Sequence, residues 1–175
     1  DVIRVTGLHP FRMQVSGRVH SCINAFGEEL MVHQAERAVA EASALSGASV
    51  RDYTAAPVFM SAERTGGHEW LIEFAQPPQG GLDLFVECLD ASLQRQNSDY
   101  AAKRTGNLAM EYPVVQAVPV GTFDQWLKSK GKWGGQHKVL RLSGDRNMLK
   151  EVLLAKQWIE RSQLVHQEVP DEPSK

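Results

Sequence analysis

The residues best suited to chemistry lie in a glycine-rich, cationic segment toward the C-terminal end of the chain. The segment spans residues 131–142 and contains three glycines, together with Lys132, Lys138 and Arg141. Glycines allow positive φ values and a close approach of the backbone to a ligand, and an ammonium group on such a loop can neutralise a phosphate or a developing negative charge. Lys132 is followed by Trp133 rather than Ser or Thr, so the segment is not a Walker A loop. We therefore expect Lys138 to meet an anion, and the alternative is a solvated basic turn.

Composition limits the classes of protein to consider. The chain has 175 residues, of which 42% are hydrophobic, and a net charge of −2. These values predict one globular domain with its own core and argue against nucleic-acid or membrane binding. Cys22 and Cys88 lack metal-ligand spacing, which favours reduced thiols in a cytoplasmic protein. The chain starts at Asp1 without an initiator Met, so we expect a piece of a longer protein, although tag removal would also explain this start.

The first half of the chain predicts two β-hairpins separated by a helix. Alternating apolar and polar residues are typical of half-buried strands. The strands are expected at residues 2–6, 11–16, 50–60 and 68–74. Apolar residues recur at helical spacing from Glu28 to Leu45, where Glu28 and Glu29 suit the positive end of a helix dipole and Gly47 ends the pattern.

The second half predicts helices that alternate with short strands. The elements are expected as a long helix from Leu82 to near Gly106, a strand at 114–120, a short helix capped by Thr122, a short apolar strand after Lys138, and a helix at 145–161. Together the pattern favours an α+β, or mixed α/β, fold in which helices flank a small sheet with β-hairpins. Residues 1–162 would form the domain, and residues 163–175 would form a flexible tail.

Several other residues receive structural interpretations. Trp70, Trp126 and Trp158 are expected in the core, and His68 in a polar loop. Arg141 and Arg146 are expected as solvated charges or as partners of carboxylates. Asp99, Lys103 and Arg104 either pack against a partner domain or lie on a plain helix surface.

Ordered blocks of sequence resemble the mobile C-terminal domain of adenylate-forming enzymes, and more closely that of the Gretchen Hagen (auxin-responsive promoter) family of acyl acid amido synthetases. The blocks are Asp1-Val2-Ile3-Arg4-Val5, Ser16-Gly17-Arg18-Val19-His20, Asn24-Ala25-Phe26-Gly27-Glu28-Glu29, Asn97-Ser98-Asp99-Tyr100, Gly121-Thr122-Phe123 and Gly134-Gly135-Gln136-His137-Lys138-Val139-Leu140-Arg141-Leu142. The resemblance extends to about Leu154.

The resemblance implies roles for particular positions. Asp1 is similar to the Asp that binds the ribose hydroxyls of ATP. Arg18 is similar to the arginine of the hinge motif, which implies a contact with the nucleotide, and its structural alternative is pairing with Glu28 or Glu29 near the hinge. His20 stands where the superfamily usually has Asp or Lys as the pivot. Lys138 is similar to the catalytic lysine that contacts the α-phosphate and acyl oxygens, while Leu140 replaces a proline that is common there.

The resemblance also implies an activity for the whole protein. An ATP-dependent ligase would adenylate a carboxylic acid and transfer the acyl group to an amino acid, with ATP and Mg²⁺ held mainly by an N-terminal adenylation domain of the same polypeptide. The lid domain alone would be inactive. The alternatives are an acyl-coenzyme A ligase with a thiol acceptor and a non-catalytic, small-molecule-binding or regulatory module. No metal site is expected within the lid itself.

Overall fold

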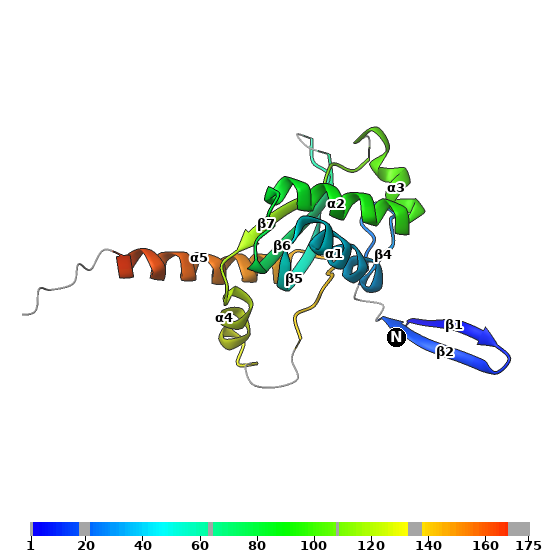
Figure 1. Ribbon diagram of the computed structural model, residues 1–175, viewed down its shortest axis with the longest axis horizontal. Coiled ribbons are helices and arrows are strands. Elements are labelled where there is room, and N and C mark those ends of the chain that lie inside the picture. Colours follow the sequence, from blue (N-terminus) through cyan, green and yellow to red (C-terminus); the bar gives the residue numbers. More distant parts are fainter. Residues whose placement is uncertain (1, 18–21, 63–64, 108, 133–137, 168–175) are drawn as a thin grey trace, which may run out of the picture.

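The computed structural model has helices on both faces of a small β-sheet (Figure 1). It describes residues 2–17, 22–62, 65–107, 109–132 and 138–167. The helices are α1 (Val32–Ser46), α2 (Gly81–Gln96), α3 (Ser98–Arg104), α4 (Thr122–Ser129) and α5 (Asn147–Gln167). The strands are β1 (Val2–Leu8), β2 (Phe11–Gly17), β3 (Cys22–Ile23), β4 (Leu30–Met31), β5 (Ser49–Val58), β6 (Gly67–Gln76) and β7 (Val114–Val118). The predicted α+β fold is confirmed.

The central sheet has the order β5-β6-β7. β5 and β6 form the predicted antiparallel hairpin, whereas β7 pairs with β6 in parallel. The apolar segment after Lys138 lies along the outer edge of β5, but it forms an isolated bridge between Leu142 and Ala55 rather than the expected strand. The edge of β5 is therefore covered over a short stretch only.

The central strand β6 separates two hydrophobic clusters. Trp70, Ile72 and Phe74 share one face, as predicted, and pack with α1 and α2. Leu71 points to the other face, where it meets Phe123 of α4 and residues of α5. Because both faces of β6 are covered, the strand is buried almost continuously. Figure 1 shows α1 and α2 together on one side of the sheet and α4 toward the other.

The N-terminal hairpin of β1 and β2 is antiparallel, as expected, and it projects away from the central sheet (Figure 1). Beyond it, β3 pairs with β4 around a compact turn. In the sequence, the hairpin and this turn flank residues 18–21, for which the resemblance implies a hinge.

The first predicted helix begins later than its pattern indicates. Residues 28–31 form the turn and β4, and α1 starts at Val32 with no acidic residue in its first turn. Glu28 is buried and binds backbone N–H groups of the turn, so its expected role at a helix terminus is wrong. Gly47 does end the helix in the left-handed conformation, at φ 68°.

The long helix expected between Leu82 and Gly106 is two helices that meet at Asn97. Asn97 has an extended backbone, and its side chain accepts a hydrogen bond from the Tyr100 N–H, which caps α3. It also donates to the carbonyl of Glu28 at 2.7 Å. A polar side chain that caps one helix and holds a distant turn therefore interrupts a continuous helical pattern.

The remaining differences concern helix ends and tryptophans. The N-cap of α4 is Gly121, with Thr122 as the first helical residue. α5 runs to Gln167, into the segment expected as a tail, and projects beyond the sheet (Figure 1). Trp70 is fully buried and Trp126 is partly buried, but Trp158 on α5 is 57% exposed, so its expected core position is wrong.

Candidate functional site

Lys138 lies on the surface, directly after the undescribed residues 133–137. Its ammonium group has no hydrogen bond or ion pair with any other described residue. A charge in this state is available to an external anion, because no internal carboxylate holds it. This exposure suits both sequence-based interpretations of Lys138, the contact with an anion and the solvated basic turn, so its chemical role stays a prediction.

The residues that follow Lys138 are fixed to β5. The Thr54 hydroxyl donates to the Leu140 carbonyl at 2.7 Å. The Ala55 N–H donates to the Arg141 carbonyl at 2.9 Å, and the Ser143 N–H donates to the Ala55 carbonyl at 3.0 Å. Neighbouring Val139 and Leu142 are buried. Lys138 thus stands two residues from a hydrogen-bonded attachment to the sheet.

Arg141 and Arg146 are partners of carboxylates, which is one of their two predicted roles. Arg141 forms an ion pair with Asp52, donates to the Tyr53 carbonyl at 3.1 Å, and lies over the Tyr53 ring. Arg146 pairs with Glu69 of β6 and donates to the Pro57 carbonyl at 3.0 Å. Both arginines therefore hold the segment around Lys138 against the sheet.

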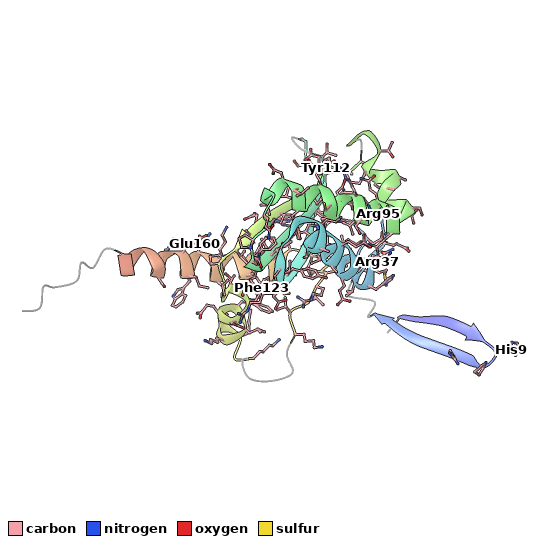
Figure 2. The ribbon with its side chains drawn as sticks, viewed as in Figure 1. His9, Arg37, Arg95, Tyr112, Phe123 and Glu160 are labelled. Carbon is pink, nitrogen blue, oxygen red and sulfur yellow. The ribbon has the colours of Figure 1, made fainter. Side chains whose placement is uncertain are left out.

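The helix that precedes the glycine-rich segment is held from two sides. Glu73 of β6 is buried and accepts hydrogen bonds from the N–H groups of Gly121 and Phe123 at 3.0 and 3.2 Å, so it caps α4. Figure 2 shows Phe123 on α4 facing the body of the domain. On α5, Glu151 accepts hydrogen bonds from Lys130 Nζ and from Trp126 Nε1, and these hydrogen bonds lower the pKa of Glu151.

The residues expected at the hinge and ribose site, Asp1, Arg18 and His20, lie outside the described residues. The alternative pairing of Arg18 is likewise untested. The turn that follows them is described, and its centre is the buried Glu28.

Glu28, His68 and Asn97 form a polar cluster, called here the Glu28 cluster. The Glu28 carboxylate accepts from the N–H groups of Ala25 and Phe26 at 3.2 and 2.7 Å, and it lies 2.8 Å from His68 Nε2. Burial alone would raise the pKa of Glu28, but the hydrogen bond and charge of His68 and the backbone N–H groups outweigh it and lower the pKa.

Sequence reasoning missed the Glu28 cluster. His68 belongs to β6 and is 1% exposed, so its expected position in a polar loop is wrong. Forty residues separate Glu28 from His68, and local spacing carries no signal for such a pair. The alternation of Trp70, Ile72 and Phe74, extended back by two positions, would have placed His68 inside the core.

Arg104 also differs from its prediction. Its side chain is 3% exposed and pairs with Asp90 at 2.8 Å. Asp90 accepts further hydrogen bonds from Tyr100 and Gln94. We call Asp90, Tyr100 and Arg104 the Asp90 cluster. It is internal, so the predicted position of Arg104 on a plain helix surface is wrong.

The described residues contain no group of three or more His, Cys, Asp or Glu side chains arranged to hold a metal ion. Cys22 and Cys88 are not joined by a disulfide. Among the helices of the described ranges, none has the length and apolar character that crossing a membrane requires.

Comparisons with known proteins agree with the motifs. The family model described as "GH3 family C-terminal domain" matches residues 33–147. One similar solved structure is a GH3.15 acyl acid amido synthetase, with a TM-score of 0.68 and 19% identity over 90% of this chain. Another is AtGH3.15 acyl acid amido synthetase in complex with 2,4-DB, with a TM-score of 0.64 and 18% identity over 87% of this chain.

The two alignments cover 30% and 29% of the solved chains, so this chain spans under a third of their length. A comparison with curated proteins gives no match. At these identities the solved structures show a shared fold, while the family model covers well over half of the chain. The chain therefore belongs to the GH3 family, of which it contains the C-terminal domain.

Proposed function

We propose that this domain is the lid of an ATP-dependent acyl acid amido synthetase, which adenylates a carboxylic acid and transfers the acyl group to an amino acid. The observation that carries the proposal is the family match over residues 33–147. The two similar structures, both described as acyl acid amido synthetases, support it through the shared fold. The acid and the amine would bind largely to an upstream adenylation domain of the same polypeptide.

Lys138 would supply positive charge to the adenylation step. Adenylation brings a carboxylate against the α-phosphate of ATP, so two anions must be held together while negative charge develops. The ammonium of Lys138 is exposed and unpaired among the described residues, and its C-terminal neighbours are hydrogen-bonded to β5. This arrangement suits a charge that is delivered from a rigid domain and withdrawn when the domain moves.

The domain would rotate about residues near Arg18 and His20. The β3–β4 turn that follows is joined to β6 by Glu28 and His68, and to α3 by Asn97. These contacts support a hinge N-terminal to Cys22, because they tie the β3–β4 turn to the body of the domain. Asp1 would contribute to the ribose site from the other side of the hinge.

ATP and Mg²⁺ would be bound mainly by the upstream domain, with one contact from this domain. Lys138 offers one ammonium to a phosphate, whereas the described residues hold no cluster of acidic side chains or histidines that suits a metal ion. Mg²⁺ is usually bound by one or two carboxylates together with substrate phosphates. We assign those carboxylates to the upstream domain, and we assign the reaction to the cytoplasm.

The test is ATP–pyrophosphate exchange by the complete polypeptide, over a panel of carboxylic acids. We expect acid-dependent exchange that falls by roughly 10²-fold or more in Lys138→Ala, the magnitude seen when one preorganised charge-stabilising group is removed. Lys132→Ala is the matched control, because it removes an exposed lysine from the same segment. If Lys138→Ala exchanges pyrophosphate at the unaltered rate, the assignment of Lys138 is wrong. If no acid of the panel supports exchange, the protein does not adenylate those acids.

A further inference from the structure

A groove of about 310 Å³ lies between α4 and α5. Its lining is mainly apolar and includes Trp126 and Lys130 of α4 together with Glu151, Leu154, Ala155 and Trp158 of α5. The family match ends at residue 147, where α5 begins. The α5 wall of the groove therefore lies outside the matched region, and the proposed function does not use it.

Two large apolar side chains of the groove are open to solvent. Leu154 is 65% exposed and Trp158 is 57% exposed, and they lie one turn apart on the same face of α5. Ala155, the small residue between these positions in the sequence, is buried. Figure 1 shows α5 projecting beyond the sheet, which leaves this face uncovered by the rest of the described chain. Exposed apolar surface of this kind is typical of an interaction site.

Lysines border the groove on the α4 side. Lys130 and Lys132 are both exposed. Lys130 donates to Glu151 at 2.7 Å. The hydrogen bonds from Lys130 and Trp126 lower the pKa of Glu151, and the charges of both lysines add to this effect. Lys132 therefore lies within electrostatic reach of the groove.

Cations also border the groove on the α5 side. Lys150 precedes Leu154 by four residues, and Arg161 follows Trp158 by three, so the four side chains share one side of the helix. Lys150 and Arg161 are exposed, and neither has an ion-pair partner among the described residues. They lie about 16 Å apart along α5, at a rise of about 1.5 Å per residue. The groove thus has an apolar centre with cations along both margins.

This arrangement favours one kind of occupant. A helix whose apolar stripe has carboxylates on both sides matches an apolar groove with cations on both margins. A second copy of this chain would bring the same cations to the groove and would be repelled. A small anion would leave Leu154 and Trp158 exposed, and a bilayer surface is flat and would not fill the concave part beside Ala155.

We propose that the groove between α4 and α5 docks an acidic amphipathic helix of a partner protein. Apolar side chains of that helix would pack on Leu154 and Trp158, and its carboxylates would pair with Lys132 on one margin and with Lys150 and Arg161 on the other. Trp158 would contribute most of the affinity, because tryptophan is enriched among the residues that dominate binding energy. The charged margins would set orientation and the rate of association. This interaction does not depend on the proposed adenylation.

The experiment is a titration of the complete polypeptide with fluorescently labelled synthetic peptides of about 15 residues, long enough to span the groove as a helix. The first peptide has a stripe of Leu with Glu on both sides and Ala elsewhere. The second has the same composition in an order without an apolar face, and the third has Lys in place of Glu. We expect the first to bind at least about tenfold more tightly than the others, and to bind more weakly as salt is added.

Two outcomes of the titration would overturn the proposal. If the first and second peptides bind equally, the groove does not recognise an amphipathic helix. If the first peptide does not bind, the groove is not open to a partner helix in the complete polypeptide. Vesicles of phosphatidylserine are titrated in parallel. If they bind through Leu154 and Trp158 while the first peptide does not, the surface serves a membrane and the proposal is wrong.

Variants link peptide binding to the groove. Leu154→Ser should weaken it by about fivefold, and Trp158→Ala by at least about tenfold. Leu45→Ser is the matched control, because Leu45 is 66% exposed on α1, on the other side of the sheet. Lys150→Gln should weaken binding by about threefold, and Arg37→Gln on α1 should leave it unchanged.

The variants and the adenylation assay fail independently. Peptide binding that survives both Leu154→Ser and Trp158→Ala would overturn the proposal. The titration needs no ATP, so a negative result leaves the adenylation proposal intact, and absent pyrophosphate exchange leaves the docking groove intact.

Discussion

The charged groups of the buried polar clusters have partners inside the fold, whereas Lys138 has none among the described residues. In the Asp90 cluster, side chains that are 2–3% exposed neutralise each other, and the carboxylate of the Glu28 cluster is satisfied from within the fold. At Lys138 the ammonium is left for the exterior while the residues after it are bonded to the sheet. The difference teaches that internal ion pairs stabilise the body of this domain, whereas the charge that we propose to act in adenylation has no partner among the described residues.

The largest expected effect is on the Asp90 cluster. Asp90→Ala should lower the free energy of unfolding by about 3–5 kcal/mol, because it leaves the buried Arg104 without its counter-ion and Tyr100 without its acceptor. Urea denaturation measures this change, with Glu87→Ala as an exposed control on the same helix. If Asp90→Ala and Glu87→Ala are equally stable, the buried ion pair contributes no more to the stability of the fold than an exposed carboxylate.

The Glu28 cluster should show a smaller, pH-dependent effect. Glu28 has a lowered pKa in the fold, so its stabilisation is fully present above its ordinary pKa of 4.5 and is lost as the pH falls through the lower folded value. Glu28→Gln should lower the free energy of unfolding by about 2 kcal/mol at neutral pH. It should also flatten the acid limb of the stability curve, which is the fall in that free energy at pH values below the ordinary pKa of a glutamate. Glu29→Gln, an exposed neighbour, should leave that limb unchanged. A steep acid limb in Glu28→Gln would contradict the account.

The attachment of the Lys138 segment can be weakened without touching its charge. Thr54→Val removes the hydroxyl that donates to Leu140, at an expected cost of about 1 kcal/mol, and should accelerate hydrogen exchange of the Ser143 amide. Thr122→Val removes a similar bond to Pro119 but lies outside the attachment. If both variants alter exchange at Ser143 equally, Thr54 has no special part in holding this segment.

The smallest effect should come from Glu41, on the surface shared by α1 and α2. Hydrogen bonds from Ser92, Arg37 and Arg95 lower its pKa to about 2. Figure 2 shows Arg37 and Arg95 on these two helices. Exposed pairs are screened by salt, so the destabilisation by Glu41→Gln should disappear near ~1 M salt, whereas that of Glu28→Gln should persist. Unfolding curves at low and high salt compare the two variants. If the destabilisation by Glu41→Gln is the same at both salt concentrations, salt does not distinguish the exposed carboxylate from the buried one.

Periodicity predicted much of the fold. The alternation around Trp70, Ile72 and Phe74 located β6 and its buried face, and Gly47 marked the end of α1. Predictions failed where a distant side chain decides the local structure. Asn97 interrupts a helical pattern because it binds Glu28, and Glu73 caps α4 from a strand about fifty residues earlier.

Less of the candidate site could be predicted. The glycines and lysines of residues 131–142 indicated Lys138 as a charge that could meet an anion, and that role stays a prediction. The groove between α4 and α5 depends on two helices meeting in space, and no spacing along the chain encodes that meeting. Asp1, Arg18 and His20 rest on resemblance alone.

The most direct measurement separates the two half-reactions of the complete polypeptide. Lys138→Ala would be supplied with a preformed acyl adenylate and an amino acid, and the rate of amide formation would be compared with that of the unaltered protein. If Lys138 acts in adenylation and a different face serves the transfer step, amide formation should continue at the unaltered rate although pyrophosphate exchange has collapsed. Equal loss of both half-reactions would contradict a charge that is delivered for one step and withdrawn for the next.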